Sequence, residues 1–100
     1  MAQEEIREIA QRYKAALEKA IHPASIILFG SHARGNPGPN SDIDIAVVVD
    51  RIEGDYLEFQ SQLWRIRREV DDRIEPVLIL EGSDPSGFYE HIKSYGETIA

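Results

Sequence analysis

The sequence predicts an α/β (α+β) fold in which a small mixed sheet of three to four strands is flanked by helices. Two observations predict it: short branched apolar runs are interspersed with segments whose apolar residues recur every three or four positions, and the order is α-β-β-α-β-α. A chain of 100 residues is long enough to bury one core without disulfides or metals. We therefore expect one domain over residues 1–100.

Three segments have the spacing of amphipathic helices. The first covers about residues 3–21, and Pro23 would end it. The second covers roughly residues 53–72, and the third is a short helix over 88–95. The apolar positions of the second helix, which we expect in the core, are Tyr56, Leu57, Leu63, Trp64, Ile66 and Val70. Its exposed side carries Glu58, Arg65 and Arg68.

Three short runs rich in branched apolar residues predict buried strands: residues 25–30, 43–49 and 74–80. Pro76 cannot donate a hydrogen bond to a neighbouring strand, which places the third run at a sheet edge or makes its start irregular. Residues 96–100 allow either a fourth short strand or a frayed end. Residues 31–41 have loop composition, with room for one helical turn at 32–34.

The connections predict which strand ends meet. A loop joins the first two strands, so we expect them to run antiparallel, whereas a helix joins the second to the third and favours a parallel pair. The end of the first strand and the starts of the other two then share one end of the sheet. The polar and glycine residues brought to that end are Gly30, Ser31, Asp42, Asp44 and Glu75.

Asp42 and Asp44 lie two residues apart at the start of a strand, so their side chains should share one face. Two adjacent carboxylates repel each other, and a divalent cation relieves that repulsion. Ser31 and the amides after Gly30 lie where a strand opens into a turn, a suitable place for phosphate oxygens. A site for metal and phosphate competes here with a plain turn at Ser41 and Asp42.

Two familiar loops can be excluded. A calcium loop beginning at Asn40 would need a glycine where Ile45 stands and a glutamate where Arg51 stands. A phosphate loop beginning at Gly30 would need lysine and serine or threonine where Asn36 and Pro37 stand.

Net charge and composition argue against several classes of binding partner and binding site. A net charge of −7 argues against broad binding of nucleic acid, although a small metal-shielded nucleotide is compatible with it. The absence of cysteine excludes disulfides and thiolate metal sites. The acidic first residues do not resemble a signal peptide, and no apolar run is long enough to cross a membrane. We expect a cytoplasmic protein, and an oligomer is compatible with the sequence.

Gly30-Ser31, ten further residues and Asp42-Ile43-Asp44 resemble the nucleotidyltransferase signature of the DNA polymerase β superfamily. With Gly30-Ser31-His32-Ala33-Arg34-Gly35, the segment is most similar to the minimal nucleotidyltransferase (MNT) branch. That branch is known for small proteins that pair with a HEPN-type partner in toxin–antitoxin modules. The resemblance covers the motif closely and nearly the whole chain in element order, and it implies the polymerase β-like nucleotidyltransferase fold.

The resemblance also implies roles for individual residues. The family has a third carboxylate on the next strand, usually aspartate, and Glu75 holds the matching position here, with Asp71 and Asp72 as rivals. The three carboxylates Asp42, Asp44 and Glu75 would be catalytic and would hold Mg²⁺, two ions in all. The candidates for binding the nucleotide, with ATP as the implied substrate, are Gly30, Ser31, Arg34 and Ser41.

Other polar residues have plainer interpretations. Arg34 could contact phosphate or could be a solvated loop residue, and the sequence favours neither. We expect His32 on the loop surface, and Arg65, Arg67 and Arg68 on a solvated charged face.

Three functions stay open at this point. The first is transfer of AMP from ATP to a tyrosine of a HEPN-type partner toxin, which silences it. The second is an antitoxin that neutralises its partner by contact alone, which the glutamate at position 75 would permit. The third, adenylylation of a small molecule, fits a chain this short poorly, because an acceptor site usually needs an additional domain.

Overall fold

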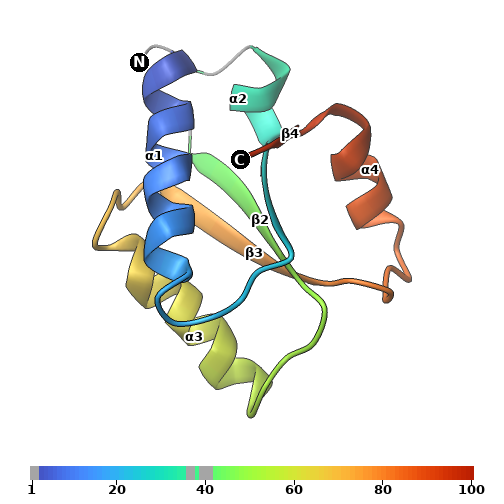
Figure 1. Cartoon of the computed structure of the whole chain (residues 1–100). Helices are drawn as coiled ribbons and strands as arrows, with labels where there is room; N and C mark the ends of the chain where they lie inside the picture. Colours follow the sequence, from blue (N-terminus) through green and yellow to red (C-terminus); the bar gives the residue numbers. More distant parts are fainter. Residues whose placement is uncertain (1–2, 36–37, 39–41) are drawn as a thin grey trace.

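The computed structural model describes residues 3–35, 38 and 42–100 (Figure 1). Its elements, in chain order, are α1 (Gln3–Leu17), β1 (Ser25–Phe29), α2 (Gly30–Arg34), β2 (Ile43–Val49), α3 (Tyr56–Arg67), β3 (Ile74–Leu80), α4 (Phe88–Tyr95) and β4 (Glu97–Thr98). The predicted second and third strands and the last helix have the observed bounds. Within the described residues, no helix is long and apolar enough to cross a membrane.

The four strands form one mixed sheet in the order β3-β2-β1-β4. β1 pairs with β2 antiparallel, and β2 pairs with β3 parallel, which confirms both predicted connections. β3 lies at an edge, as Pro76 predicted. Residues 97–98 form the fourth strand, which pairs with β1 on its other side.

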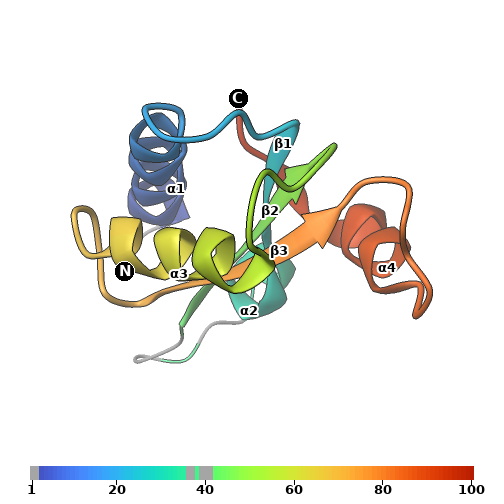
Figure 2. The same ribbon diagram turned by 90° about the horizontal axis from the view of Figure 1, so that it is seen from below.

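Helices cover both faces of the sheet. α1 and α3 lie on one side and α4 on the other, as Figures 1 and 2 show from two directions. Side chains of β2 alternate between two cores: Ile43, Ile45, Val47 and Val49 belong to the larger one under α1 and α3, and Ala46 and Val48 to the smaller one under α4. The even-numbered residues at the start of β2 therefore face the α4 side.

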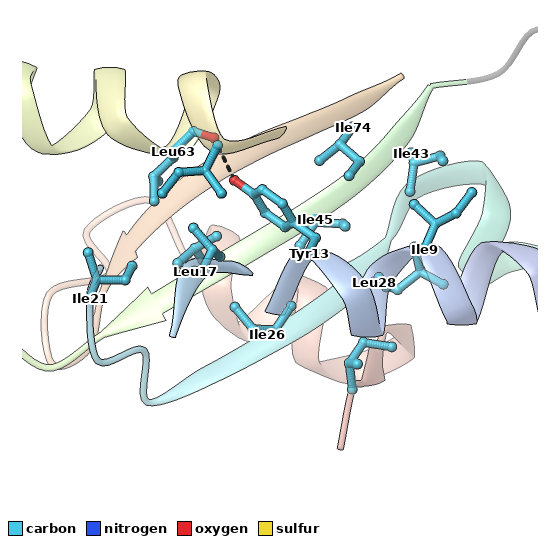
Figure 3. Packing of buried hydrophobic residues seen from close by; sticks show 14 of the residues in the cluster. Ile9, Tyr13, Leu17, Ile21, Ile26, Leu28, Ile43, Ile45, Leu63 and Ile74 are labelled. Carbon is cyan, nitrogen blue, oxygen red and sulfur yellow. Dashed lines mark hydrogen bonds between the residues drawn. The ribbon is translucent and has the colours of Figure 1, made fainter. Parts of the chain in front are cut away.

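A buried hydrogen bond joins the two helices of the larger core. The Tyr13 hydroxyl of α1 donates to the Leu63 carbonyl of α3 at 2.8 Å, and the Tyr13 side chain is fully buried (Figure 3). Burial raises the pKa of this phenol. The contact satisfies a hydroxyl that would be costly to bury alone and fixes α1 against α3.

Three sequence-based expectations about the helices are wrong in detail. α1 ends at Leu17 rather than residue 21. α3 begins at Tyr56 rather than residue 53, because Asp55 caps it, accepting a hydrogen bond from the Leu57 amide at 3.3 Å, and it ends at Arg67 rather than residue 72. Tyr56 and Trp64 are 49% and 38% exposed, so neither is a core residue, and Leu57 is exposed as well. α3 buries a narrower stripe than its apolar content suggested.

Candidate active site

Gly30 forms the turn by which β1 passes into α2. Its φ of 72° is in the left-handed region, which favours glycine, and Gly35, which follows the last residue of α2 and caps it, is in the same region. A Cβ on Gly30 would overlap the Asp44 carboxylate. Because Gly30 has no side chain, the Asp44 carboxylate of the neighbouring strand β2 has room beside the turn. The helical turn expected at 32–34 is present and begins two residues earlier.

Strand register brings the candidate carboxylates to one end of the sheet. Asp44 is paired with Phe29 of β1 on one side and with Glu75 of β3 on the other. Asp42 lies two residues before Asp44, at the same end. Asp44 and Glu75 are half-buried and Asp42 is exposed. We call these three residues the carboxylate cluster.

Within the carboxylate cluster, burial and neighbouring charges shift the pKa values of Asp44 and Glu75. Partial burial, and then the charge of Asp42, raise the pKa of Asp44, while His32 acts in the opposite direction. Burial raises the pKa of Glu75, and so do the charge of Asp42, a hydrogen bond shared with it and the charge of Asp44. Arg67 opposes this rise. The cluster thus carries more negative charge than its surroundings neutralise.

The chemistry of this donor set suits a hard divalent cation, because carboxylate oxygens are the ligands that Mg²⁺ prefers. In the part of the chain that the structure describes, no three acidic, histidine or cysteine side chains are placed so that they could hold a metal ion as they stand. The fit therefore rests on the type of donor and on the mutual repulsion within the carboxylate cluster, which a cation would relieve.

Asp71 and Asp72, the alternatives to Glu75 as the third carboxylate, are placed differently. Asp71 accepts two hydrogen bonds from the Arg73 guanidinium, at 2.6 and 2.9 Å, and one from the Arg73 amide at 2.8 Å. This arrangement closes the turn between α3 and β3, and it lowers the pKa of Asp71. The side chain of Asp72 is exposed, while its backbone carbonyl accepts from Arg67. Glu75 is the residue of the three that lies in register with Asp44.

Arg34 is directed toward α4. Its guanidinium carbon lies 4.5 Å from the centre of the Tyr95 ring, and its Nη2 lies 3.3 Å from His91 Nε2. The Tyr95 hydroxyl also accepts a hydrogen bond from the Gly30 amide at 3.0 Å. Tyr95 therefore contacts both ends of α2.

Sequence reasoning missed three residues near this site. His32, expected on the surface, is 5% exposed and lies close enough to Asp44 to influence its ionisation. Arg67, expected on a solvated face, is half-buried and donates to the carbonyls of Asp72 and Ile74 beside the start of β3. Tyr95 gave no signal, because its contact with Gly30 spans 65 residues.

Two predicted nucleotide-binding residues remain, and the structure describes one of them. Ser31 is half-buried in the first turn of α2, beside Gly30. Ser41 lies outside the described residues.

Comparison with known proteins identifies the family. The profile described as polymerase beta, nucleotidyltransferase matches residues 4–100. The chain belongs to the polymerase β nucleotidyltransferase family. This confirms the resemblance seen in the Gly-Ser and Asp-x-Asp motifs, and it makes the chain a nucleotidyltransferase. The sheet and its helices match the polymerase β-like nucleotidyltransferase fold.

Individual relatives of this nucleotidyltransferase support the same family assignment. "Putative protein adenylyltransferase MJ1379" of Methanocaldococcus jannaschii is 39% identical over 77 residues, which cover 77% of this chain and 70% of that protein. "Putative protein adenylyltransferase MJ1215" of the same organism is 38% identical, over 74% of this chain and 76% of that protein. The crystal structure of "a putative nucleotidyltransferase" from Sulfolobus solfataricus superposes with a TM-score of 0.67 at 20% identity, over 96% of this chain and 80% of that chain.

Proposed function

We propose that this nucleotidyltransferase moves AMP from ATP to a tyrosine hydroxyl of a HEPN-type partner protein, with Mg²⁺, and so acts as an antitoxin. The observation that carries the proposal is the register of Asp44 with Glu75, directly beside the Gly30 turn. Two relatives named as protein adenylyltransferases support AMP and a protein acceptor. The partner and the antitoxin role come from the resemblance to the MNT branch.

In the proposed reaction the tyrosine oxygen attacks the α-phosphorus of ATP, the bond to the bridging oxygen breaks, and pyrophosphate leaves. Asp42 and Asp44 would hold Mg²⁺, and Glu75 would complete the set. Bound Mg²⁺ would supply charge neutralisation for the attacking and leaving oxygens. Glu75 would also take the proton of the hydroxyl, while Ser31 and the Gly30 turn hold the β and γ phosphates and Arg34 contacts phosphate.

ATP labelled on the α-phosphate tests this proposal when it is incubated with Mg²⁺, this protein and a HEPN-type protein encoded beside it. We expect label on the partner, and a loss of at least about a hundredfold in the double variant Asp42→Asn/Asp44→Asn. The matched control is Asp50→Asn, an exposed aspartate at the other end of β2, which should retain transfer.

Two results would overturn the catalytic proposal. Label that persists in the double variant would place the chemistry elsewhere. A stable complex that forms equally well with the double variant, without any transfer by the unaltered protein, would instead establish neutralisation by contact alone.

A further inference from the structure

The C-terminal helix reaches the turn that the proposed function assigns to nucleotide binding. We propose that Tyr95 is a positioning residue, which holds the Gly30 turn through its hydroxyl and the Arg34 guanidinium through its ring. This inference rests on the proposed function for its catalytic consequence.

The Tyr95 hydroxyl accepts a hydrogen bond from the Gly30 amide, for which α2 itself has no acceptor. Gly30 is the first residue of α2, so its N–H has no partner within that helix. Tyr95 Oη accepts this hydrogen bond at 3.0 Å. Because the Gly30 backbone has a φ of 72° and lies directly against the Asp44 carboxylate, an acceptor at this amide helps fix the backbone that the site requires.

The Tyr95 ring contacts the guanidinium of Arg34, an exposed side chain with many rotamers. The guanidinium of Arg34 lies 4.5 Å from the centre of the Tyr95 ring, and His91 Nε2, one turn earlier in α4, lies 3.3 Å from Arg34 Nη2. The His91 and Tyr95 rings are themselves 5.3 Å apart. Arg34 is thereby held in one direction before a phosphate arrives, which reduces the entropy lost on binding.

Tyr95 is itself fixed to β1, the strand that ends directly before Gly30. The next residue, Gly96, packs so closely that a Cβ there would lie 2.7 Å from Ile27 Cγ2 and 3.0 Å from the Leu28 carbonyl. The following residues form β4, which pairs with the same part of β1. The end of α4 and the end of β1 therefore keep a fixed separation.

Hydrogen exchange of the Gly30 amide, measured by NMR without nucleotide, tests the contact directly. We expect Tyr95→Phe to accelerate this exchange about fivefold, the effect of one ordinary hydrogen bond. Tyr89→Phe is the matched control on the same helix, where the ring contacts Lys93 instead, and it should leave the rate unchanged. An unchanged rate in Tyr95→Phe would overturn the proposal.

Transfer kinetics test the consequence. Tyr95→Phe, which keeps the ring, should raise KM for ATP about fivefold and change kcat less than twofold. Tyr95→Leu should raise KM further, and Arg34→Ala should cost less in that background than alone, because Arg34 has already lost its ring. A fall in kcat in proportion to the folded fraction, with KM unchanged, would show a purely structural role and overturn the proposal.

The two proposals fail in different ways. If the unaltered protein transfers no label to any partner, the proposed function is wrong. The exchange rate of the Gly30 amide then decides alone whether Tyr95 positions the turn.

Discussion

At the scale of single residues, Gly30 and Gly35 separate two effects of glycine. Both have a left-handed φ, 72° and 79°, but a Cβ on Gly30 would overlap Asp44, whereas one on Gly35 would meet nothing within 4 Å. Gly35→Ala should cost about 1–2 kcal/mol of stability for its φ alone and keep activity. Gly30→Ala should cost more and abolish transfer, because the Asp44 carboxylate must move.

Urea unfolding and the labelled-ATP assay on both alanine variants check this prediction. Equal loss of transfer in the two would show that the backbone conformation matters and that the space beside Asp44 does not.

The ion pair between Arg7 and Glu97 predicts a pH dependence of stability. Hydrogen bonds from the Arg7 guanidinium, at 2.5 and 3.2 Å, lower the pKa of Glu97 below its ordinary value of 4.5. A carboxyl with a lower pKa in the folded state stabilises the fold fully above the unfolded value, and this contribution disappears as the pH falls through the folded value. Glu97→Gln should therefore lower stability at pH 7 and make no difference at strongly acidic pH.

Because both side chains are partly exposed, solvent screens the pair and the effect of Glu97→Gln should be small. Urea unfolding at the two pH values measures it. Glu53→Gln is the control, since its pair with Arg51 is more exposed still and should contribute little at either pH. A Glu97→Gln deficit of the same size at both pH values would contradict the prediction.

At the scale of elements, the strands were predictable and the second helix was predictable only in part. Residues 43–49 and 74–80 are short runs rich in branched apolar residues, so composition alone indicates both strands. α3 carries apolar residues around more of its circumference than the core accepts, so periodicity could not show that Trp64 is exposed while Leu63 is buried. That distinction depends on where α1 packs.

The contact between α1 and α3 is open to a sharp test. Tyr13→Phe keeps the buried ring but removes the hydrogen bond from the hydroxyl to the Leu63 carbonyl, so we expect a loss of about 1–2 kcal/mol. Leu63→Ala should cost about 2–5 kcal/mol, because it opens a cavity in the same place. Thermal or urea unfolding measures both, with Tyr56→Phe, at a half-exposed ring, as the control. A Tyr13→Phe variant as stable as this control would contradict the prediction.

At the scale of the whole molecule, the carboxylate cluster should couple metal binding to stability. Its repulsion is present in the folded protein, so a cation that binds there adds RT ln(1 + [L]/Kd), about 2.7 kcal/mol at a hundred times Kd. Mg²⁺ should therefore raise the melting temperature of the unaltered protein and of Asp50→Asn. It should not raise that of Asp42→Asn/Asp44→Asn. Equal shifts in all three would show that the metal binds elsewhere.

The sequence predicted where the candidate residues meet better than it predicted the contacts that hold them there. Motif spacing and strand order alone indicated that Gly30, Asp44 and Glu75 meet at one end of the sheet, and the strand register confirms it. Neither could show that His32 is buried or that Tyr95 contacts Gly30, because these facts depend on how α2 and α4 pack. Local patterns specify elements, whereas contacts between distant segments arise only from tertiary packing.

The distance along the chain between Gly30 and Tyr95 has a consequence for biosynthesis. The amide is made 65 residues before the hydroxyl that accepts its hydrogen bond. At ribosomal rates of about 5–20 residues per second, this interval lasts roughly 3–13 seconds. A nascent chain in that interval already contains Gly30 and Asp44 but has no α4 to hold the turn. The segment that contains Tyr95 thus leaves the ribosome well after the motif, and a chain shortened before Tyr95 would carry the signature motif without the hydroxyl that contacts the Gly30 amide.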